Sequence, residues 1–408
     1  MKKLKVALVS PFPPSKGTLN EYAYHLVKHM QNNEGFSEIV VITDKLPEGE
    51  TYDIEQTDVK VSFKEVWKFN SLTNFWKIIK AIKESNADIA FYNIQFLSFG
   101  DKKIPATLGL LTPMLTKLMG VKSVVLLHNI IETVDYSSAG ITNNPMMKWI
   151  YNFFGTILTM MVLTSDLVAV TMAKYVNILN EKYGADNVVL MPHGSFELPE
   201  LPSFDSEPQK KQVMTFGKFG TYKKVEKMID AVNIVKERIG EEIEIVIAGT
   251  DNPNVKGYLA DVAKKYEHIK DLRFTGYVEE EDVPKIFRDS TVVVFPYTST
   301  TGSSGVLHQA GSYGKAVALP NIGDLKELIE NEGYSGSYFE SEDVTTMANA
   351  IEKLLTDRSY RIQIAKQNYK AAASLPMSDI VEMYRQHFLK LCPAQIKQLS
   401  ISEKLSAA

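Results

Sequence analysis

Short runs of apolar, largely β-branched residues recur along the chain and alternate with segments of helical periodicity. The first runs are KVALVS, EIVVITD and DIAFYNI, and segments such as NEYAYHLVKHM and NFWKIIKAIKES lie between them. A run that is apolar at every position predicts a strand buried on both faces. Repeated strand–helix units of this kind indicate parallel sheets that are covered by helices on both sides.

The alternation is interrupted once, at residues 197–212, where the sequence ELPELPSFDSEPQKKQ is rich in Pro, Ser and charged residues. Such a composition predicts an interdomain linker. The chain of 408 residues is also too long for one ordinary core. We therefore predict an N-terminal doubly wound α/β domain at 1–196 and a second one at 213–376. Ligands bind such sheets at the carboxyl ends of strands, so two facing domains would hold a ligand in a central cleft.

The run WIYNFFGTILTMMVLTS at 149–165 is the most membrane-like stretch of the sequence. Its length is near the lower limit for a membrane span, and it contains Asn152, Gly155 and three threonines. A buried helix is the favoured interpretation. A helix that lies against a membrane surface is the alternative. The N-terminal run VALV is too short for a signal peptide and is better explained as a buried strand.

The composition is that of an ordinary globular protein, with 45% hydrophobic and 23% charged residues. The net charge of −4 gives no global basic excess that would suggest a nucleic-acid partner. Cys392 is the single cysteine, which excludes disulfide scaffolds and cysteine-based metal sites. These features fit a reducing compartment and a cytoplasmic location, with a peripheral position on the cytoplasmic face of the membrane as the variant of that prediction.

A turn rich in small residues, TTGSSG, follows the predicted strand TVVVFPY and precedes a short helix, VLHQAGSYG. Ser303 or Ser304 can cap this helix, and Gly302 and Gly305 permit close approach of a ligand. Free N–H groups and the helix dipole bind phosphate well. Taken alone, a Ser/Gly-rich turn is more often only a turn.

Three further features lie at carboxyl ends of predicted strands. Lys218 and Lys223 follow the strand VMTFG in a loop and could neutralise a diphosphate, although solvated surface lysines are the ordinary alternative. Gly17 and Thr18, at the start of a helix, offer an anion or sugar site in the other domain. His128 ends the strand SVVLLH, where a histidine is more often structural than catalytic. Their shared position predicts that all of them face one cleft.

The order and spacing of these elements resemble the retaining GT-B glycosyltransferases of family four, the glycosyl transferases group 1 type. The similarity runs through PFPPSKGTLNEYAYHL, LLHNI, SDLVAVT, VVLMPHG, TFGKFGTYKKVEKMIDA, IAGT, LRFTGYV, VVVFPY and SSGVLHQAGSYGKAVALP. It implies a GT-B fold of two Rossmann-like domains facing a central cleft, with the donor on the C-terminal domain and the acceptor on the N-terminal one. It also implies a last helix at 378–391 that packs back on the N-terminal domain, and we expect 393–408 to form a loose tail.

The resemblance also assigns roles to individual residues. Lys218 and Lys223 would hold the diphosphate, and His128 would lie near the reacting sugar. Backbone groups at Gly276 and Val278 would contact the base. The residues expected to bind the donor are Gly17, Thr18, Gly276, Val278, Thr301, Ser303, Ser304, Gly305, Val306 and Gln309.

Several of these positions depart from the family pattern. Two glutamates of the family fall on Thr301 and Gln309. Glutamine can still hydrogen-bond a diol, but without the strength of a charged acceptor. Lys218 replaces an arginine and offers a point charge instead of a bidentate fork. Lys224 stands where the family has glycine. These exchanges leave the donor sugar undetermined.

The resemblance implies a retaining hexosyltransferase that moves a sugar from a nucleotide diphosphate to a hydroxyl acceptor in glycan or glycoconjugate synthesis. UDP-sugars are favoured over GDP-sugars as donors. No Asp-x-Asp motif lies near the predicted site, so we expect catalysis without a metal or other cofactor. The acceptor stays open between a sugar, a small molecule and a lipid-linked compound. The alternatives are a GT-B protein that binds nucleotide-sugar without transfer, and a GT-B phosphorylase or epimerase.

Overall fold

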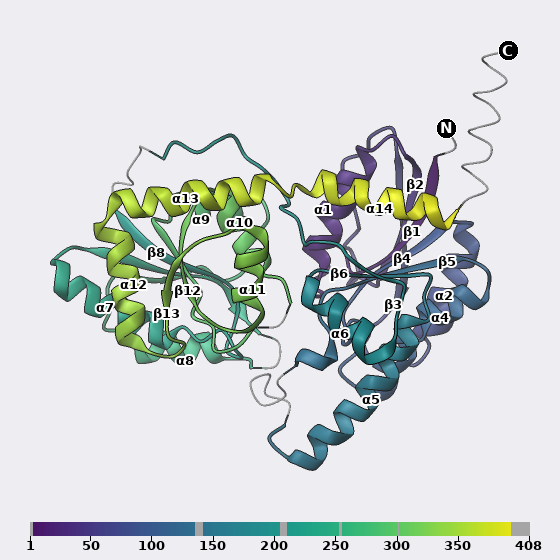
Figure 1. The fold of residues 1–408 in the computed structure, drawn as a ribbon, viewed down its shortest axis with the longest axis horizontal. Helices are drawn as coiled ribbons and strands as arrows, with labels where there is room; N and C mark the ends of the chain where they lie inside the picture. The colour runs from purple at the N-terminus through teal and green to yellow at the C-terminus, as the bar shows by residue number, and fades with distance from the viewer. Residues whose placement is uncertain (1–2, 135–141, 205–209, 253–254, 301, 393–408) are drawn as a thin grey trace. The chain divides into compact units, whose positions relative to one another are not determined.

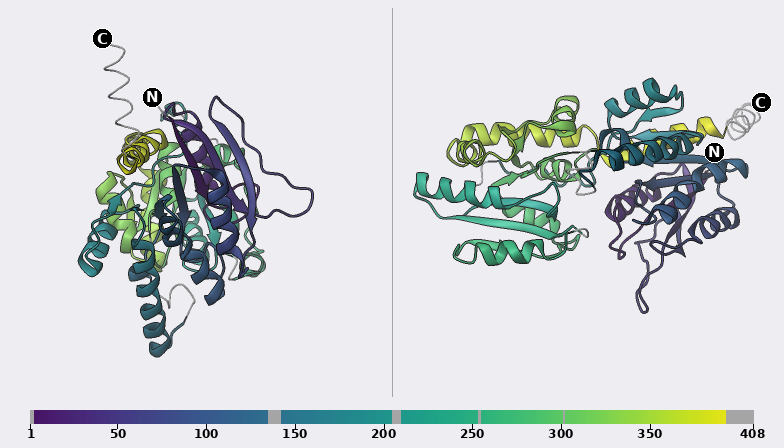
Figure 2. Two further views of the ribbon diagram at one scale, coloured as in Figure 1. Left: turned by 90° about the vertical axis from the view of Figure 1, so that its right-hand side faces the viewer. Right: turned by 90° about the horizontal axis from the view of Figure 1, so that it is seen from below.

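The computed structural model describes residues 3–134, 142–204, 210–252, 255–300 and 302–392. Thr301 and the predicted tail at 393–408 therefore lie outside the described residues. The chain divides into two compact units. The first takes residues up to Val134, Asn144–Phe196 and the segment from Met377, and the second takes Glu197–Pro376. Each unit is a parallel sheet with helices on both faces (Figures 1 and 2).

The first unit contains a seven-stranded sheet in the order β3-β2-β1-β4-β5-β6-β7, with parallel pairing throughout. The strands are β1 (Leu4–Val9), β2 (Phe36–Asp44), β3 (Lys60–Trp67), β4 (Ile89–Ile94), β5 (Lys122–Leu127), β6 (Leu167–Val170) and β7 (Val188–Leu190). The helices are α1 (Asn20–Gln31), α2 (Asn74–Ser85), α3 (Lys103–Leu110), α4 (Thr112–Leu118), the 3₁₀ turn η1 (Ile131–Thr133), α5 (Pro145–Leu163), α6 (Ala173–Tyr183) and α14 (Met377–Leu391).

The second unit contains a six-stranded parallel sheet in the order β10-β9-β8-β11-β12-β13. The strands are β8 (Lys211–Phe219), β9 (Ile243–Asp251), β10 (Leu272–Phe274), β11 (Val292–Val294), β12 (Ala316–Pro320) and β13 (Ser337–Phe339). The helices are α7 (Glu226–Ile239), α8 (Tyr258–Lys265), α9 (Val283–Asp289), α10 (Gly305–Ser312), α11 (Gly323–Glu332), α12 (Val344–Thr356) and α13 (Arg358–Ala373). The prediction of two doubly wound parallel sheets is confirmed.

Strand order reverses at one place in each sheet. In the first unit β1 lies between β2 and β4, and in the second unit β8 lies between β9 and β11. The crossover helices change from one face of the sheet to the other at such a point, which opens a crevice at the carboxyl ends of the two central strands. The loops after β1 and β4, and those after β8 and β11, therefore border the positions where a ligand can enter each unit.

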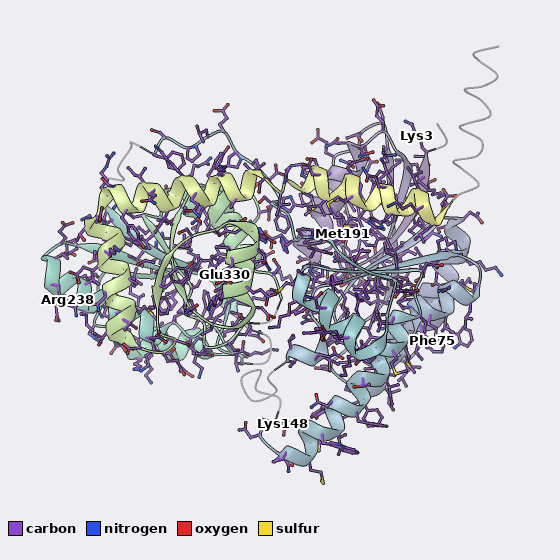
Figure 3. The ribbon with its side chains drawn as sticks, in the orientation of Figure 1. Lys3, Phe75, Lys148, Met191, Arg238 and Glu330 are labelled. Carbon is purple, nitrogen blue, oxygen red and sulfur yellow. The ribbon has the colours of Figure 1, made fainter. Side chains whose placement is uncertain are left out.

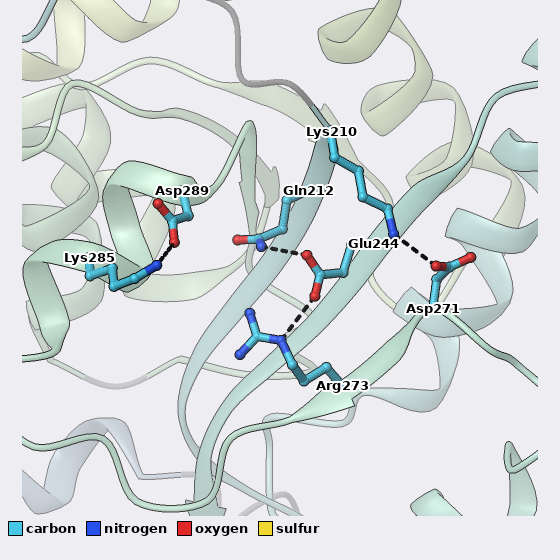
Figure 4. Close-up of polar contacts among 7 residues, drawn as sticks. All are labelled: Lys210, Gln212, Glu244, Asp271, Arg273, Lys285 and Asp289. Carbon is cyan, nitrogen blue, oxygen red and sulfur yellow. Dashed lines mark hydrogen bonds and ion pairs between the residues drawn. The ribbon is translucent and has the colours of Figure 1, made fainter.

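Polar side chains link the strands of the second sheet at their amino ends, opposite the crevice (Figure 4). Gln212 Nε2 and Arg273 Nε donate to the two oxygens of the Glu244 carboxylate, each at 2.9 Å. Lys210 Nζ pairs with Asp271 at 2.9 Å. These residues lie near the amino ends of β8, β9 and β10 and link neighbouring strands. Their partly exposed ion pairs contribute little to the free energy of folding. Because these side chains occupy the amino ends of the strands, the carboxyl ends are left for ligands.

Helix α14 completes the core of the first unit. Its residues Ile380, Tyr384 and Phe388 are fully or almost fully buried there. The ring of Phe91 from β4 lies 4.7 Å from that of Tyr384 and 5.4 Å from that of Phe388. Burial of such large apolar side chains contributes about 2 kcal/mol each, so α14 is a structural part of the unit.

Helix α5 corrects one prediction. The run at 149–165 was expected to be a buried helix, yet only 17% of the apolar window of α5 is buried. Trp149 is 66% exposed and Phe154 58% exposed. By length and composition α5 is also the one helix among the described segments that could cross a membrane. The prediction failed because composition shows that a helix is apolar, but not how much of its circumference other elements cover.

Two glycines allow β8 and β9 to approach each other at their carboxyl ends. Gly217 and Gly249 pair across the two strands, with φ of 133° and 136°. A Cβ atom on Gly249 would lie 1.9 Å from the carbonyl oxygen of Gly217. Neither the conformation nor the space at this point accepts a side chain.

We predict that Gly249→Ala lowers the free energy of unfolding by at least about 3 kcal/mol, because strain and a backbone clash add together. Gly240→Ala is the matched control, since Gly240 has a φ of 67° with no atom within 4 Å of an added Cβ. Its cost should be about 1 kcal/mol. Urea unfolding followed by circular dichroism measures both. Equal costs for the two variants would contradict the role given to the close approach.

Candidate functional site

A pocket opens in the second unit where its strand order reverses. Its walls come from the loop after β8, the loop after β11, the first turn of α10 and the start of α11. The lining residues are Tyr222, Lys223, Tyr297, Thr300, Gly302, Ser303, Ser304, Gly305, Val306 and Leu325. The structure thus brings together Lys223 and the turn 303–306, two of the features that the sequence singled out.

Lys223 is the charged group of this pocket. The residue is only 9% exposed, and its Nζ lies 4.8 Å from the ring centre of Tyr297 and 5.9 Å from that of Tyr222. Burial lowers the pKa of the Lys223 ammonium. No carboxylate of the described chain lies within ion-pair distance of it. Aromatic faces compensate only part of the cost of burying a cation, so an anion beside Lys223 would be strongly favoured.

The first turn of α10 has no side-chain cap. Ser304 occupies the N-cap position, but no side chain accepts a hydrogen bond from the turn. The hydroxyl of Ser303 instead lies 3.0 Å from Nε2 of His308. The prediction that Ser303 or Ser304 caps the helix is therefore wrong. Because the N–H groups of the turn lack a side-chain acceptor and the helix dipole points toward them, this end of α10 is suited to an anion.

The start of α11 holds the preceding turn in place. The backbone N–H of Gly302 donates to Oδ2 of Asp324 at 3.0 Å, and the N–H of Leu325 donates to Oγ1 of Thr300 at 3.1 Å. Asp324 is 2% exposed. Sequence reasoning missed this carboxylate, because an aspartate in the first turn of a helix is common and carries no sign of its distant partner.

A buried polar cluster supports the same turn from behind. Nδ1 of His308 lies 2.8 Å from the hydroxyl of Tyr334, and Nε2 lies 3.6 Å from Oε2 of Glu332. Burial raises the pKa of the Glu332 carboxyl to about 8. Ser303 lines the pocket and contacts His308. His308 in turn lies beside Glu332, whose carboxyl can be neutral at pH 7.

Four other predicted residues of the donor site do not line this pocket, namely Lys218, Gly276, Val278 and Gln309. Lys218 is a residue of β8, opposite Thr250 of β9, so its predicted placement in a loop is wrong. Gln309 is buried within α10, 9% exposed. Gly276 and Val278 follow β10, with Gly276 bridged to Gly249. These residues share the carboxyl edge of the sheet with the pocket without forming its wall.

A second constellation lies at the carboxyl ends of β1, β4 and β5 in the first unit. Nε2 of His128 contacts Oδ1 of Asn93 at 2.6 Å. Nδ2 of Asn93 donates to the carbonyl of Leu19 at 3.3 Å and to the hydroxyl of Ser10 at 2.9 Å. A carbonyl can only accept, so Oδ1 of Asn93 faces the histidine and His128 Nε2 is the donor.

This geometry defines the protonation state of His128. Burial, with a smaller effect of the neighbouring His193, lowers the pKa of His128 to about 3. The ring is therefore neutral at pH 7, with its proton on Nε2 and a lone pair on Nδ1. Such a nitrogen can accept a hydrogen bond from a hydroxyl group. Sequence reasoning singled out His128 but missed Asn93, the residue that orients it.

Gly17 and Thr18 lie in the loop between β1 and α1. They lie two and three residues before α1, which begins at Asn20, where the segment NEYAYHLVKHM predicts a helix. The N–H of Gly17 donates to Oγ of Ser15 at 3.2 Å, and Thr18 is exposed. The contact between Asn93 and Leu19 joins this loop to His128. The two N-terminal predictions therefore belong to one site.

No group of three or more His, Cys, Asp or Glu side chains that could hold a metal ion occurs in the part of the chain that the structure describes.

Glu332 predicts a pH dependence of stability. Its carboxyl is protonated in both states below its ordinary pKa of 4.5, whereas between that value and about 8 only the unfolded state ionises. Stability should therefore fall as pH rises through this window, by up to about 5 kcal/mol. Glu332→Gln should flatten the slope of thermal unfolding against pH. Glu330→Gln, at an exposed position of the same helix (Figure 3), is the control and should leave the slope unchanged. An equal slope in both variants would exclude Glu332 as its source.

The comparison with known proteins also separates the second unit from the first. Residues 200–371 match the family described as glycosyl transferases group 1. A curated relative, an uncharacterized glycosyltransferase of Methanocaldococcus jannaschii, is 24% identical over 169 residues, which is 41% of this chain and 42% of the relative. The chain thus matches less than half the length of that relative.

Solved structures resemble nearly the whole chain. Sucrose-phosphate synthase from Thermosynechococcus elongatus has a TM-score of 0.73 at 16% identity, over 96% of this chain and all of the other. HepE of Anabaena, solved in complex with UDP and glucose, has a TM-score of 0.67 at 13% identity, over 95% and 100%. At such identities the likeness shows the fold alone. The second unit therefore matches the glycosyl transferases group 1 family over residues 200–371, and the chain has the GT-B fold.

Proposed function

We propose that the protein is a retaining glycosyltransferase that moves a hexose from a nucleotide diphosphate to a hydroxyl acceptor. The observation that carries this proposal is the buried, carboxylate-free ammonium of Lys223 beside the uncapped first turn of α10. A diphosphate would satisfy both with one ligand. The family of the matching domain supports sugar transfer as the use of that site.

Uridine nucleotides are the favoured donors. HepE has been solved with UDP and with UDP-glucose, and another structure of the same fold is a UDP-forming trehalose-phosphate synthase of Burkholderia xenovorans. The sugar itself is not fixed by these likenesses. The exchange of two family glutamates for Thr301 and Gln309 removes negative charge from the donor side.

Sugar transfer from a diphosphate needs stabilisation of the leaving group. Negative charge grows on the β-phosphate as its bond to the sugar lengthens, and fixed cations and N–H groups nearby stabilise it. Lys223 and the turn 303–306 are placed for this role. We therefore expect activity without a divalent metal. Lys218, at the end of β8, would add a second positive charge near the same edge of the sheet.

On the acceptor side, neutral His128 is suited to binding a sugar hydroxyl. Nδ1 can accept the hydroxyl proton in a hydrogen bond while Asn93 holds the ring in place. A pKa of about 3, set by burial, means that His128 is not a general acid at pH 7. Its role in this proposal is to orient a reactant.

We predict that Lys223→Ala lowers kcat/KM by about 30- to 1,000-fold, which corresponds to roughly 2–4 kcal/mol of lost transition-state stabilisation. Lys224→Ala is the matched control, because Lys224 is the next residue and is exposed. Its activity should stay within about twofold of the parent. Steady-state assays with UDP-sugars measure both. A rate for Lys223→Ala equal to that of Lys224→Ala would remove Lys223 from the site.

We predict that Gln309→Glu tightens binding of UDP if this residue meets the ribose hydroxyls, because a carboxylate accepts stronger hydrogen bonds than an amide. Calorimetric titration with UDP gives the affinity. Unchanged affinity in a folded variant would show that Gln309, buried in α10, lies away from the ribose.

The decisive experiment for the proposed function is calorimetric titration with UDP, GDP and ADP, first without metal and then with Mg²⁺. Binding of UDP without metal, followed by transfer from a UDP-sugar, is the expected result. Binding without any transfer would support the alternative of a non-catalytic nucleotide-sugar-binding protein. Failure of all three nucleotides to bind would overturn the proposal and favour a phosphorylase, which inorganic phosphate dependence would reveal.

A further inference from the structure

Large apolar side chains are exposed on adjoining helices of the first unit. They include Trp76 of α2 (67% exposed), Ile104 of α3 (65%), Leu118 of α4 (75%) and Trp149 of α5 (66%). Helix α2 contacts α3 and α4, and both of these contact α5. The exposed side chains therefore belong to one continuous layer of helices, which we term the apolar helix layer. So much exposed aromatic and aliphatic surface marks an interaction site.

Helix α5 has two distinct sides. Gly155, Thr159 and Val162 are buried, and an added Cβ at Gly155 would lie 2.4 Å from the side chain of Ile131. The opposite side carries exposed large side chains at helical spacing. These are Met146, Trp149, Phe153 and Met160.

Because one side of α5 packs against the rest of its unit, this helix cannot span a membrane. Lys182 Nζ also donates to Oγ1 of Thr156 at 3.3 Å, which ties the middle of the helix to α6. A helix that is part of an α/β unit cannot be surrounded by lipid. Its outer side, however, is free to lie in an interface, and the helix extends away from its unit toward Lys148 (Figures 1 and 3).

The charges on α3, α4 and α5 are of one sign. Residues 102–122 and 144–163 contain no Asp or Glu, although the whole chain has more acidic than basic residues. Within these segments Lys102, Lys103, Lys117, Lys122 and Lys148 accompany the apolar side chains, and Lys122 pairs with Asp166 at 3.2 Å. Lys103 Nζ lies 5.3 Å from the ring centre of Tyr151, so its cation is placed beside the aromatic surface of α5.

We propose that the apolar helix layer docks on the surface of a membrane rich in anionic phospholipids, with the outer side of α5 among the headgroups. Tryptophan and phenylalanine side chains suit the boundary between headgroups and acyl chains. Lysines on helices that contain no Asp or Glu, as α3, α4 and α5 do, are attracted to anionic lipids. Protein–protein interfaces, by contrast, are depleted in lysine. This inference does not depend on sugar transfer, since it rests on a different surface of the molecule.

The test is co-sedimentation of the full chain with two kinds of vesicle, phosphatidylcholine alone and an equal mixture of phosphatidylcholine and phosphatidylglycerol. The anionic vesicles should bind at least tenfold more tightly, and binding should weaken as salt screens the lysines. Trp149→Ser with Phe153→Ser should reduce binding to anionic vesicles at least tenfold. Leu201→Ser with Tyr338→Ser, at exposed apolar positions of the second unit, is the matched control and should bind like the parent.

The contribution of charge is measured separately. Lys102→Gln with Lys103→Gln and Lys148→Gln should lower binding to anionic vesicles and leave the weak binding to neutral ones unchanged. Equal binding of the parent to both vesicles would overturn the anionic specificity. No binding to either, together with a dimer in analytical ultracentrifugation that Trp149→Ser with Phe153→Ser dissociates, would assign the layer to self-association and overturn the proposal. Circular dichroism verifies that each variant is folded.

Discussion

Parallel strands can be joined only by crossovers, and in each sheet these crossovers change face beside one strand, β1 in the first unit and β8 in the second. The remaining architecture follows from that reversal of strand order. It opens the crevice bordered by the loops after β8 and β11, where Lys223 and the first turn of α10 meet. In the first unit the same reversal lets the loop after β1 meet Asn93 and His128. Strand order thus decides where both sites lie, and particular side chains then give each site its chemistry.

In the pocket of the second unit, other parts of the protein hold the turn before α10, while no cap side chain accepts from the first N–H groups of α10. Asp324 accepts from Gly302, and His308 contacts the hydroxyl of Ser303, so both groups position the turn from outside the pocket. The first N–H groups of α10 and the Lys223 ammonium remain to bind a ligand. The burial of Lys223 increases the attraction of an anion, because charges interact more strongly when water is excluded. The site is therefore preorganised for phosphate.

The first unit combines two surfaces of different chemistry. At the carboxyl edge of its sheet, a neutral histidine oriented by an amide offers a hydrogen-bond acceptor. On the helices α2 to α5, aromatic side chains and lysines face outward without carboxylates on α3, α4 or α5. A transferase that works beside a membrane would reach lipid-linked acceptors without extracting them into water. The two inferences remain separable, since neither uses residues of the other.

Local pattern was enough to predict two doubly wound parallel sheets in this chain. Strands such as β1, β4 and β11 are apolar at nearly every position, which identifies a buried parallel strand. Two of the four edge strands, β3 and β13, were not predicted because they mix polar with apolar residues. Sequence could not distinguish Lys218 from Lys223, since only the approach of Tyr297 from another loop buries the second lysine. It could not pair Gly302 with Asp324, nor show that the apolar helix α5 is largely exposed. Sequence determined periodicity, which depends on near neighbours; the tertiary structure alone decided burial and charge compensation, which depend on residues far apart in the chain.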